Sequence, residues 1–271
     1  MPLVSIRNVG KVYRSRKGDV AALQDINLDI EASQFVSVLG PSGCGKSTLL
    51  RCIAGLDRPT AGEIIVRDQR VEEPPASLGM VFQRDVLLEW RTVLNNVLLP
   101  VEAQRLPVGD WVAPARALLQ LMGLSGFEDR HPWELSGGMR QRVSICRALL
   151  LNPSLLLMDE PFGALDALTR DEMNLELQRV WMQHKKTVLF ITHSISEAVF
   201  SADRVVVMSP HPGRILTAID IALERPRTLA IRESAPFLQY TRHLRQVFQD
   251  MGFLRGEPSE TSREGVATSV V

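Results

Sequence analysis

The sequence predicts an α/β fold with a mixed core sheet, an antiparallel β subdomain and an inserted helical subdomain. In FVSVLGPSGCGKSTLLRCIAGL, residues 35–56, a short apolar strand, a glycine-rich loop and a helix follow one another directly. Over residues 155–208, short apolar strands alternate with helical segments. Between these two parts, residues 85–134 are helical in pattern and punctuated by proline.

Short strands lie on both sides of the glycine-rich loop. The segments VSIRNV, INLDI and GEIIV alternate apolar and polar residues, which is typical of strands with one buried face. We therefore expect residues 3–83 to form a mixed sheet with an antiparallel part that carries Tyr13.

The glycine-rich loop matches the phosphate-binding pattern G-x-x-x-x-G-K-[ST] and is followed by a helix over residues 48–56. Glycines let such a loop turn its backbone N–H groups inward on phosphate, while Lys46 reaches the terminal phosphates. The hydroxyl of Ser47 is then available to Mg²⁺. We expect ATP to contact Gly40, Pro41, Ser42, Gly43, Cys44, Gly45, Lys46, Ser47 and Thr48.

Two acidic residues follow a buried strand in SLLLMDEPFGALD. Residues 155–158 form that strand, so Asp159 and Glu160 lie at its carboxyl end, where open α/β sheets bind ligands. We predict that Asp159 holds Mg²⁺, directly or through water. Glu160 is then placed to orient or deprotonate an attacking water.

Residues 85–134 are predicted to form a helical arm, in which APARALLQLMGL is the clearest helix. After the arm the core resumes with a helix that starts at Ser136. Strands and helices are then expected at residues 155–159, 166–184, 188–192, 194–201 and 204–208. One apolar face of the helix at 166–184 is interpreted as core packing: Met173, Leu177, Val180 and Trp181.

The start of the helix after the arm, LSGGMRQRV, has an unusual composition. Ser136 is a good N-cap, yet Gly137 and Gly138 weaken a first turn by about 1 kcal/mol each relative to alanine. We interpret the glycines as leaving backbone N–H groups bare for close approach by an anion.

The C-terminal part is predicted to hold one more helix. After RPR at residues 225–227, Phe237, Tyr240, Leu244 and Phe248 recur at helical spacing, and the sequence leaves open whether this helix packs on its own domain or on a partner. The predicted organisation is a domain at 1–225 (core 1–84 and 135–225, helical arm 85–134), a C-terminal helical extension at 226–254 and a disordered tail at 255–271.

Composition narrows the function classes. Basic and acidic residues balance at 31 each, which does not favour a nucleic-acid partner. Cys44, Cys52 and Cys146 lack metal-like spacing and are expected to be reduced thiols. We see neither a signal-peptide pattern nor an apolar run that could span a bilayer, so any transport path is expected in another chain.

From about residue 4 to residue 227, the chain resembles the ATP-binding subunits of ABC transporters. LSGGMRQR is similar to that family's signature motif, and VFQRD, GALD and LFITHS are similar to its Q-loop, D-loop and switch motif. The resemblance implies a P-loop NTPase fold of the ABC ATPase type. It assigns functional roles to Tyr13 (stacking on adenine), Gln83 (nucleotide and metal), Asp166 (D-loop), His193 (catalysis with Glu160 and Lys46) and Ser136, Gly137, Gly138 and Met139 (signature).

The resemblance also suggests which anion the glycine pair meets. In the family, the signature helix of one subunit covers the γ-phosphate held by the P-loop of another, so a second copy of the chain is the expected partner. Two departures from the family pattern are Ser194, where an acidic residue is more usual, and Met139, where glutamine is commoner. Neither departure removes a phosphate donor.

Other classes of protein explain less of the sequence. A P-loop kinase or GTPase accounts for Lys46 and Asp159 but leaves LSGGMRQR unexplained. ABC-type DNA-repair proteins insert a long coiled coil, and those acting on ribosomes usually carry two P-loops; we find neither feature. A non-hydrolysing binding module remains an alternative, against which Glu160 and His193 count.

A separate subunit of this kind resembles an importer ATPase, expected at the cytoplasmic face of the inner membrane. Its expected partners are transmembrane permease subunits and, indirectly, an extracytoplasmic solute-binding protein. Residues 81–102 and 192–215 resemble the nitrate, sulfonate, taurine and bicarbonate group of importers, although Glu89 stands where that group often has proline. Importers of pyrimidine-type vitamin precursors share these stretches and remain an alternative.

Overall fold

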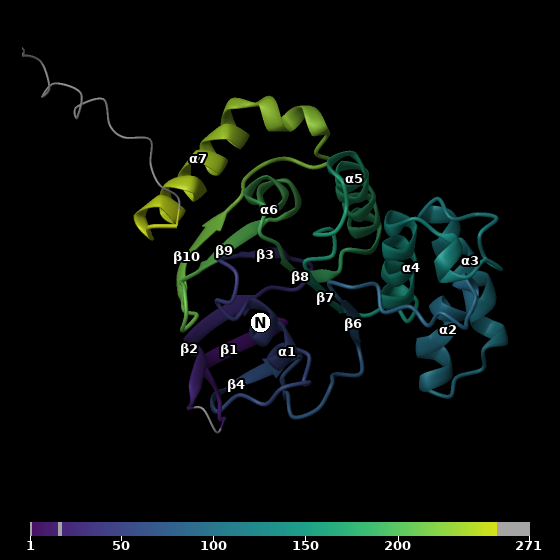
Figure 1. Cartoon of the computed structure of the whole chain (residues 1–271), viewed down its shortest axis with the longest axis horizontal. Coiled ribbons are helices and arrows are strands. Elements are labelled where there is room, and N and C mark those ends of the chain that lie inside the picture. The colour runs from purple at the N-terminus through teal and green to yellow at the C-terminus, as the bar shows by residue number, and fades with distance from the viewer. Residues whose placement is uncertain (1, 16–17, 254–271) are drawn as a thin grey trace, which may run out of the picture.

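The computed structural model describes residues 2–15 and 18–253 and contains two sheets with helices around them (Figure 1). The predicted tail at 255–271 lies outside the described residues. An α/β fold with a mixed sheet and a separate antiparallel sheet is therefore confirmed. Within the described ranges, no helix combines the length and hydrophobicity needed to cross a bilayer.

The smaller sheet is antiparallel and has the strand order β2-β1-β4-β5. Its strands are β1 (Val4–Tyr13), β2 (Val20–Ile30), β4 (Ala61–Val66) and the short β5 (Gln69–Arg70). Val4 pairs with Ile30 on one side and with Val66 on the other, so the inward apolar residues of three strands share one buried cluster. Tyr13 ends β1, in the antiparallel part predicted for it.

The larger sheet has the order β10-β9-β3-β8-β7-β6, and only β10 runs antiparallel to its neighbour. Its five parallel strands are almost entirely apolar, because both faces are covered. The bounds are β3 (Phe35–Leu39), β6 (Leu78–Val81), β7 (Leu155–Asp159), β8 (Thr187–Ile191), β9 (Arg204–Met208) and β10 (Ile215–Asp220). The sequence reading did not single out β6 and β10.

The helices agree with the predicted ones in position but differ at their ends. The phosphate-loop helix begins at Lys46 and ends at Ile53, earlier at both ends than the expected 48–56, and left-handed Gly55 follows. The bounds are α1 (Lys46–Ile53), α2 (Val93–Ala103), α3 (Gly109–Leu121), α4 (Gly137–Leu149), α5 (Ala167–His184), α6 (Ile195–Ser201) and α7 (Ala235–Asp250). Two short 3-10 helices, Pro132–Glu134 and Leu229–Glu233, precede α4 and α7.

The helical arm stands at one side of the molecule, where α2 and α3 lie beside α4 (Figure 1). Buried Asn96 on α2 bonds the backbone of Leu88, Arg91 and Thr92, and so fixes the chain that enters the arm. α4 contacts α2, α3 and also β6. The helix that the sequence reading placed in the core therefore joins the arm to the core.

The C-terminal helix α7 packs on α6 of its own domain, which settles a question that the sequence left open. Its apolar residues Phe237 and Leu244 are buried in the main core cluster. The linker before it is held by Arg227, which is 1% exposed and donates to the carbonyls of Phe200 and Ala202 at the end of α6. A guanidinium at these carbonyls satisfies groups that a helix end leaves unpaired.

Candidate functional site

The glycine-rich loop connects β3 to α1 and is pressed against β2. Gly43 and Gly45 have positive φ angles of 76° and 103°, and a Cβ atom on Gly45 would lie 2.7 Å from the carbonyl oxygen of Ala22. Only glycine fits that conformation in that space. The loop therefore presents its backbone to a hollow of about 300 Å³, lined by Ala22, Ser42, Gly43, Gly45, Lys46, Ser47, Thr48, Gln83 and Glu160.

Lys46 is drawn across the loop rather than extended into solvent. Its Nζ donates to the carbonyl oxygens of Gly40 and Pro41 at 2.8 and 3.0 Å, and the residue is only 6% exposed. A buried ammonium held by two carbonyls is a fixed positive charge beside the loop. Its role on terminal phosphates stays a prediction.

Ser47 and Asp159 come together although 112 residues separate them. The Ser47 hydroxyl donates to Asp159 Oδ1 at 3.0 Å, which brings two hard oxygen donors to one place. Burial raises the pKa of Asp159, and the neighbouring charge of Glu160 raises it further, whereas Ser47 and Lys46 act in the opposite direction. This donor set fits Mg²⁺, which would neutralise the carboxylate that burial disfavours.

The end of β7, the end of β8 and the chain at Gln83 meet at Glu160. Its backbone has a positive φ of 44° and its N–H donates to Ile191 at the end of β8. Its Oε2 lies 3.3 Å from His193 Nδ1 and 3.5 Å from Gln83 Nε2, the second contact being a weak one. The structure thus brings Glu160, His193 and Gln83 together at the carboxyl edge of the parallel strands, beside Lys46 and Asp159.

Tyr13 approaches α1 from the antiparallel sheet. Its hydroxyl donates to Asp57 Oδ2 at 2.9 Å, and Lys11 Nζ lies 5.0 Å from its ring centroid. Burial raises the pKa of Tyr13, while a hydrogen bond to Thr48 lowers it. The ring is therefore fixed next to the phosphate-loop helix, and stacking on adenine stays a prediction.

The signature residues lie at the start of α4, outside this hollow. Ser136 is the N-cap, as predicted, and its Oγ accepts from the Met139 N–H at 3.3 Å. Gly137 is exposed, whereas a Cβ on buried Gly138 would lie 2.7 Å from Thr169 Cγ2. Of the two glycines, Gly137 has no close neighbour, whereas Gly138 allows close packing against Thr169. The sequence analysis did not anticipate this packing role of Gly138.

Asp166 caps α5 directly beside the signature. Its Oδ1 accepts from the Thr169 N–H at 3.0 Å and its Oδ2 from the Thr169 hydroxyl at 2.7 Å, which lowers the pKa of Asp166. Thr169 therefore touches both the predicted D-loop residue and Gly138. Neither a motif nor its spacing marks Thr169 in the sequence.

The unusual Ser194 has a structural explanation. Its Oγ caps α6 by accepting from the Glu197 N–H at 3.3 Å, and serine and aspartate are both good N-caps. Thr192 on the other side of His193 hydrogen-bonds buried Glu197, and burial raises the pKa of that carboxyl. The residues flanking His193 are thus fixed, and the sequence reading missed Glu197 because it lies within an ordinary helical pattern.

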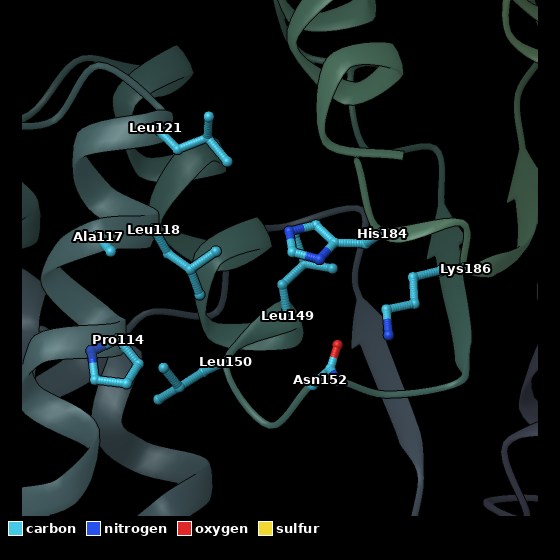
Figure 2. Close-up of a pocket in the computed structure, with 9 residues that line it drawn as sticks. All are labelled: Pro114, Ala117, Leu118, Leu121, Leu149, Leu150, Asn152, His184 and Lys186. Carbon is cyan, nitrogen blue, oxygen red and sulfur yellow. The ribbon is translucent and has the colours of Figure 1, made fainter. Parts of the chain in front are cut away.

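A second hollow has a volume of about 390 Å³ and is drawn in Figure 2. Leu118 and Leu121 of α3 and Leu149 of α4 form its apolar wall, and His184 and Lys186 stand at the opposite side (Figure 2). It contains no residue of the glycine-rich loop and no carboxylate among its lining residues. This hollow therefore does not share the phosphate-site chemistry.

Known proteins resemble this chain in sequence and in fold. The family model described as ABC transporter matches residues 23–163. An aliphatic sulfonates import ATP-binding protein of Bacillus cereus is 42% identical, over 93% of this chain and 98% of that protein. A nitrate import ATP-binding protein of Synechocystis is also 42% identical, over 98% and 99%. A solved dimeric ATP-binding cassette in a post-hydrolysis state, bound to ADP and Pi, is 32% identical with a TM-score of 0.72, over 82% and 100%.

Asp159→Asn tests the effect of this carboxylate on the free energy of unfolding separately from its effect on ATP turnover. Because the native pKa of Asp159 is raised, its ionisation destabilises the nucleotide-free fold as pH rises through the range between the ordinary and the raised pKa. We expect the variant to have a higher free energy of unfolding than the unsubstituted chain at pH 8, and the same free energy of unfolding below the ordinary pKa. Urea titrations at several pH values measure this.

The same variant should lose Mg²⁺-dependent ATP turnover by about two or more orders of magnitude. Asp129→Asn, at an exposed position of the arm, is the matched control and should change neither property. A destabilised Asp159→Asn chain at pH 8 would contradict the assignment of a desolvated carboxylate.

Proposed function

The chain belongs to the ABC transporter family of ATP-binding proteins, and from that premise we propose that it energises an importer of nitrate-, sulfonate- or taurine-type anions. It is an ATPase of this family. The observation that carries the ATP-hydrolysing part of this proposal is the convergence of Lys46, Asp159 and Glu160 at one edge of the sheet. Without that convergence, the motifs would be separate sequence matches.

Nucleotide binding is assigned to the loop and the residues around it. The backbone N–H groups of the loop and the Lys46 ammonium bind the phosphates, and Tyr13 stacks on the adenine ring. Ser47, Asp159 and Gln83 would hold Mg²⁺, which when bound neutralises charge on the phosphates.

Hydrolysis is assigned to Glu160 and His193. Glu160 accepts a proton from the attacking water as the water oxygen forms its bond to the γ-phosphorus, and the bond to the bridging oxygen of ADP breaks. His193, 3.3 Å from Glu160, orients that carboxylate and the γ-phosphate. The products are ADP and inorganic phosphate.

The active unit is proposed to be a dimer with shared sites. Residues 136–139 are absent from the lining of the phosphate hollow, although a helix N-terminus with bare amides favours an anion. A second copy that brings its own phosphate loop supplies that anion, and the related cassette bound to ADP and Pi is dimeric. Asp166, next to the signature, is then proposed to line the same interface.

Transmembrane permease subunits are proposed to dock in an apolar groove beside the arm, at the cytoplasmic face of the membrane. This arm groove, of about 390 Å³, is lined by Leu78, Gly79, Met80, Phe82, Val86, Leu99, Pro100, Ala103, Gln104, Arg147, Ala148 and Leu151. Among the apolar residues that follow Gln83, Val86 and Trp90 are exposed while Leu87 is buried. A short amphipathic helix laid in such a groove is a common recognition mode.

The substrate class rests on the relatives. The related import proteins carry the words aliphatic sulfonates and nitrate in their names, and both match more than nine-tenths of the chain. An extracytoplasmic binding protein would select the anion, because no part of this ATPase is assigned to substrate. Import of a pyrimidine-type vitamin precursor, or a role outside transport, is the alternative.

Glu160→Gln tests the hydrolytic assignment. The substitution preserves shape and removes the charge, so ATP should bind as before while turnover falls by about two or more orders of magnitude. Fluorescent-nucleotide binding and phosphate release measure the two properties. Lys46→Ala, by contrast, should weaken ATP binding itself, and near-normal turnover of Glu160→Gln would overturn the role of Glu160.

Gly137→Asp tests the shared site. An added Cβ has no neighbour closer than Arg140 Nη2 at 4.0 Å, and an acidic residue suits the first turn of a helix, so the subunit should fold and bind ATP. In a dimer its carboxylate would face the partner's γ-phosphate and abolish hydrolysis. Mixing it with Lys46→Ala should restore activity at the one site where both parts are intact.

The mixing experiment is read against each variant alone. If Gly137→Asp retained full ATPase activity, the signature would not act on a partner's nucleotide. Gly138→Asp is a poorer probe, because its side chain would also collide with Thr169.

Substrate class is tested in the assembled transporter. With its permease and binding protein in vesicles, ATP hydrolysis should rise severalfold when nitrate, an alkanesulfonate or taurine is supplied. Stimulation by a pyrimidine alone would replace the anion assignment with the vitamin-precursor alternative. A chain that hydrolyses ATP but binds no permease would indicate the non-transport role.

A further inference from the structure

Two arginines of α4 hold the segment that follows Gln83. Arg140 Nε donates to Asp85 Oδ2 at 2.8 Å. Arg147 donates to two successive carbonyls, those of Asp85 and Val86, each at 2.8 Å. These contacts join positions that lie 55 to 62 residues apart in the chain.

The segment that these arginines hold bends at Val86, a residue type that disfavours the required backbone conformation. Val86 has a φ angle of 47°, in the left-handed region that β-branched residues strongly avoid. Such a conformation persists only where surrounding contacts enforce it, and here the Arg147 guanidinium binds the carbonyl on each side of the bend. The bend is therefore maintained by α4.

The same residues form part of the arm groove. The side chains of Val86 and Arg147 both line it, and Val86 is 54% exposed. Anything that fills the groove must press on this bend and on the guanidinium that holds it.

Arg140 also contacts the chain directly before the signature residues. Arg140 donates through Nη1 to the carbonyl of Leu135 at 2.9 Å, directly before Ser136. Its Nη2 lies 4.0 Å from where a Cβ on Gly137 would stand. One guanidinium thus contacts the chain after Gln83 and the chain at the start of α4.

The Asp85/Arg140 pair is better placed than an ordinary surface ion pair. Its side chains are 27% and 34% exposed, and the Nε–Oδ2 distance of 2.8 Å is that of a charge-assisted hydrogen bond. A partly buried pair with this geometry is screened by salt less than fully exposed pairs are.

We propose that Asp85, Arg140 and Arg147 form a latch that transmits occupancy of the arm groove to the signature. Because the latch ties the bend at Val86 to the chain before Ser136, docking in the groove sets the orientation in which residues 136–138 meet the partner's nucleotide. The three are positioning residues, since none of them is among the residues that line the phosphate hollow. The inference rests on the proposed function for the identity of the groove's occupant.

A double-mutant cycle on the full chain tests the latch. Asp85→Ala, Arg140→Ala and the double variant are compared for ATP affinity at concentrations where the chain is monomeric. They are also compared for ATP-dependent dimerisation in the Glu160→Gln background, and for kcat and KM of the permease complex. We expect unchanged ATP affinity and KM, with dimerisation and kcat lowered about tenfold in each single variant and no further in the double.

The controls separate positioning from folding. Thermal unfolding confirms that each variant is native, and Asp85→Asn, which keeps the shape of the side chain, replaces any alanine variant that is not. Arg204→Ala breaks an ion pair of 2.6 Å between β9 and β10, away from α4, and should leave kcat unchanged. Native single variants with full kcat, or losses that multiply in the double variant, would overturn the latch.

Failure of the proposed function would give a different pattern. The unsubstituted chain would then not hydrolyse ATP or not associate with permease subunits. In that case the double-mutant cycle measured by ATP-dependent dimerisation tests the latch by itself. Equal losses of dimerisation in the single and double variants support the latch, and independent losses reject it.

Discussion

The parallel hydrogen-bonding of β3, β8 and β7 is the constraint on which the site depends. Phe35 pairs with Val188, and Leu155 pairs with Thr187, so the three strands end at one edge. The phosphate loop, Glu160 and His193 follow the ends of these strands and are therefore brought to the same edge of the sheet. A shift of one residue in this register would turn each carboxyl-end side chain toward the opposite face of the sheet.

The candidate site holds an acidic side chain whose charged form is disfavoured by burial. Asp159 and Glu160 are adjacent acids at a partly buried position, and burial disfavours the charged form of Asp159. Ser47 and Lys46 offset part of this cost without removing it. In the proposed site, bound Mg²⁺ would offset the remaining cost, and ligand binding and folding stability would then be linked through the same carboxylate.

α4 is the element that connects the signature residues, the helical arm and the core sheet. At its start, Gly138 touches Thr169, which Asp166 caps, and Arg140 binds Asp85. The helix also packs against α2 of the arm and against β6 of the core sheet. Its glycine pair therefore combines two features, since Gly137 leaves its backbone exposed while Gly138 permits close packing within the chain.

The sequence by itself determined the strand, loop and helix of the phosphate site, the acids after β7, the N-cap at Ser136 and the amphipathic α7. These features are local, because periodicity, glycine spacing and capping act within a few residues. Tertiary structure alone decided that α7 covers its own domain and that Asp85 meets Arg140 and Arg147. It also defined β6 and β10, the strands at the two edges of the larger sheet. Contacts across 55 or more residues leave no mark in a local pattern, because any arginine and any aspartate can form them once folding brings them together.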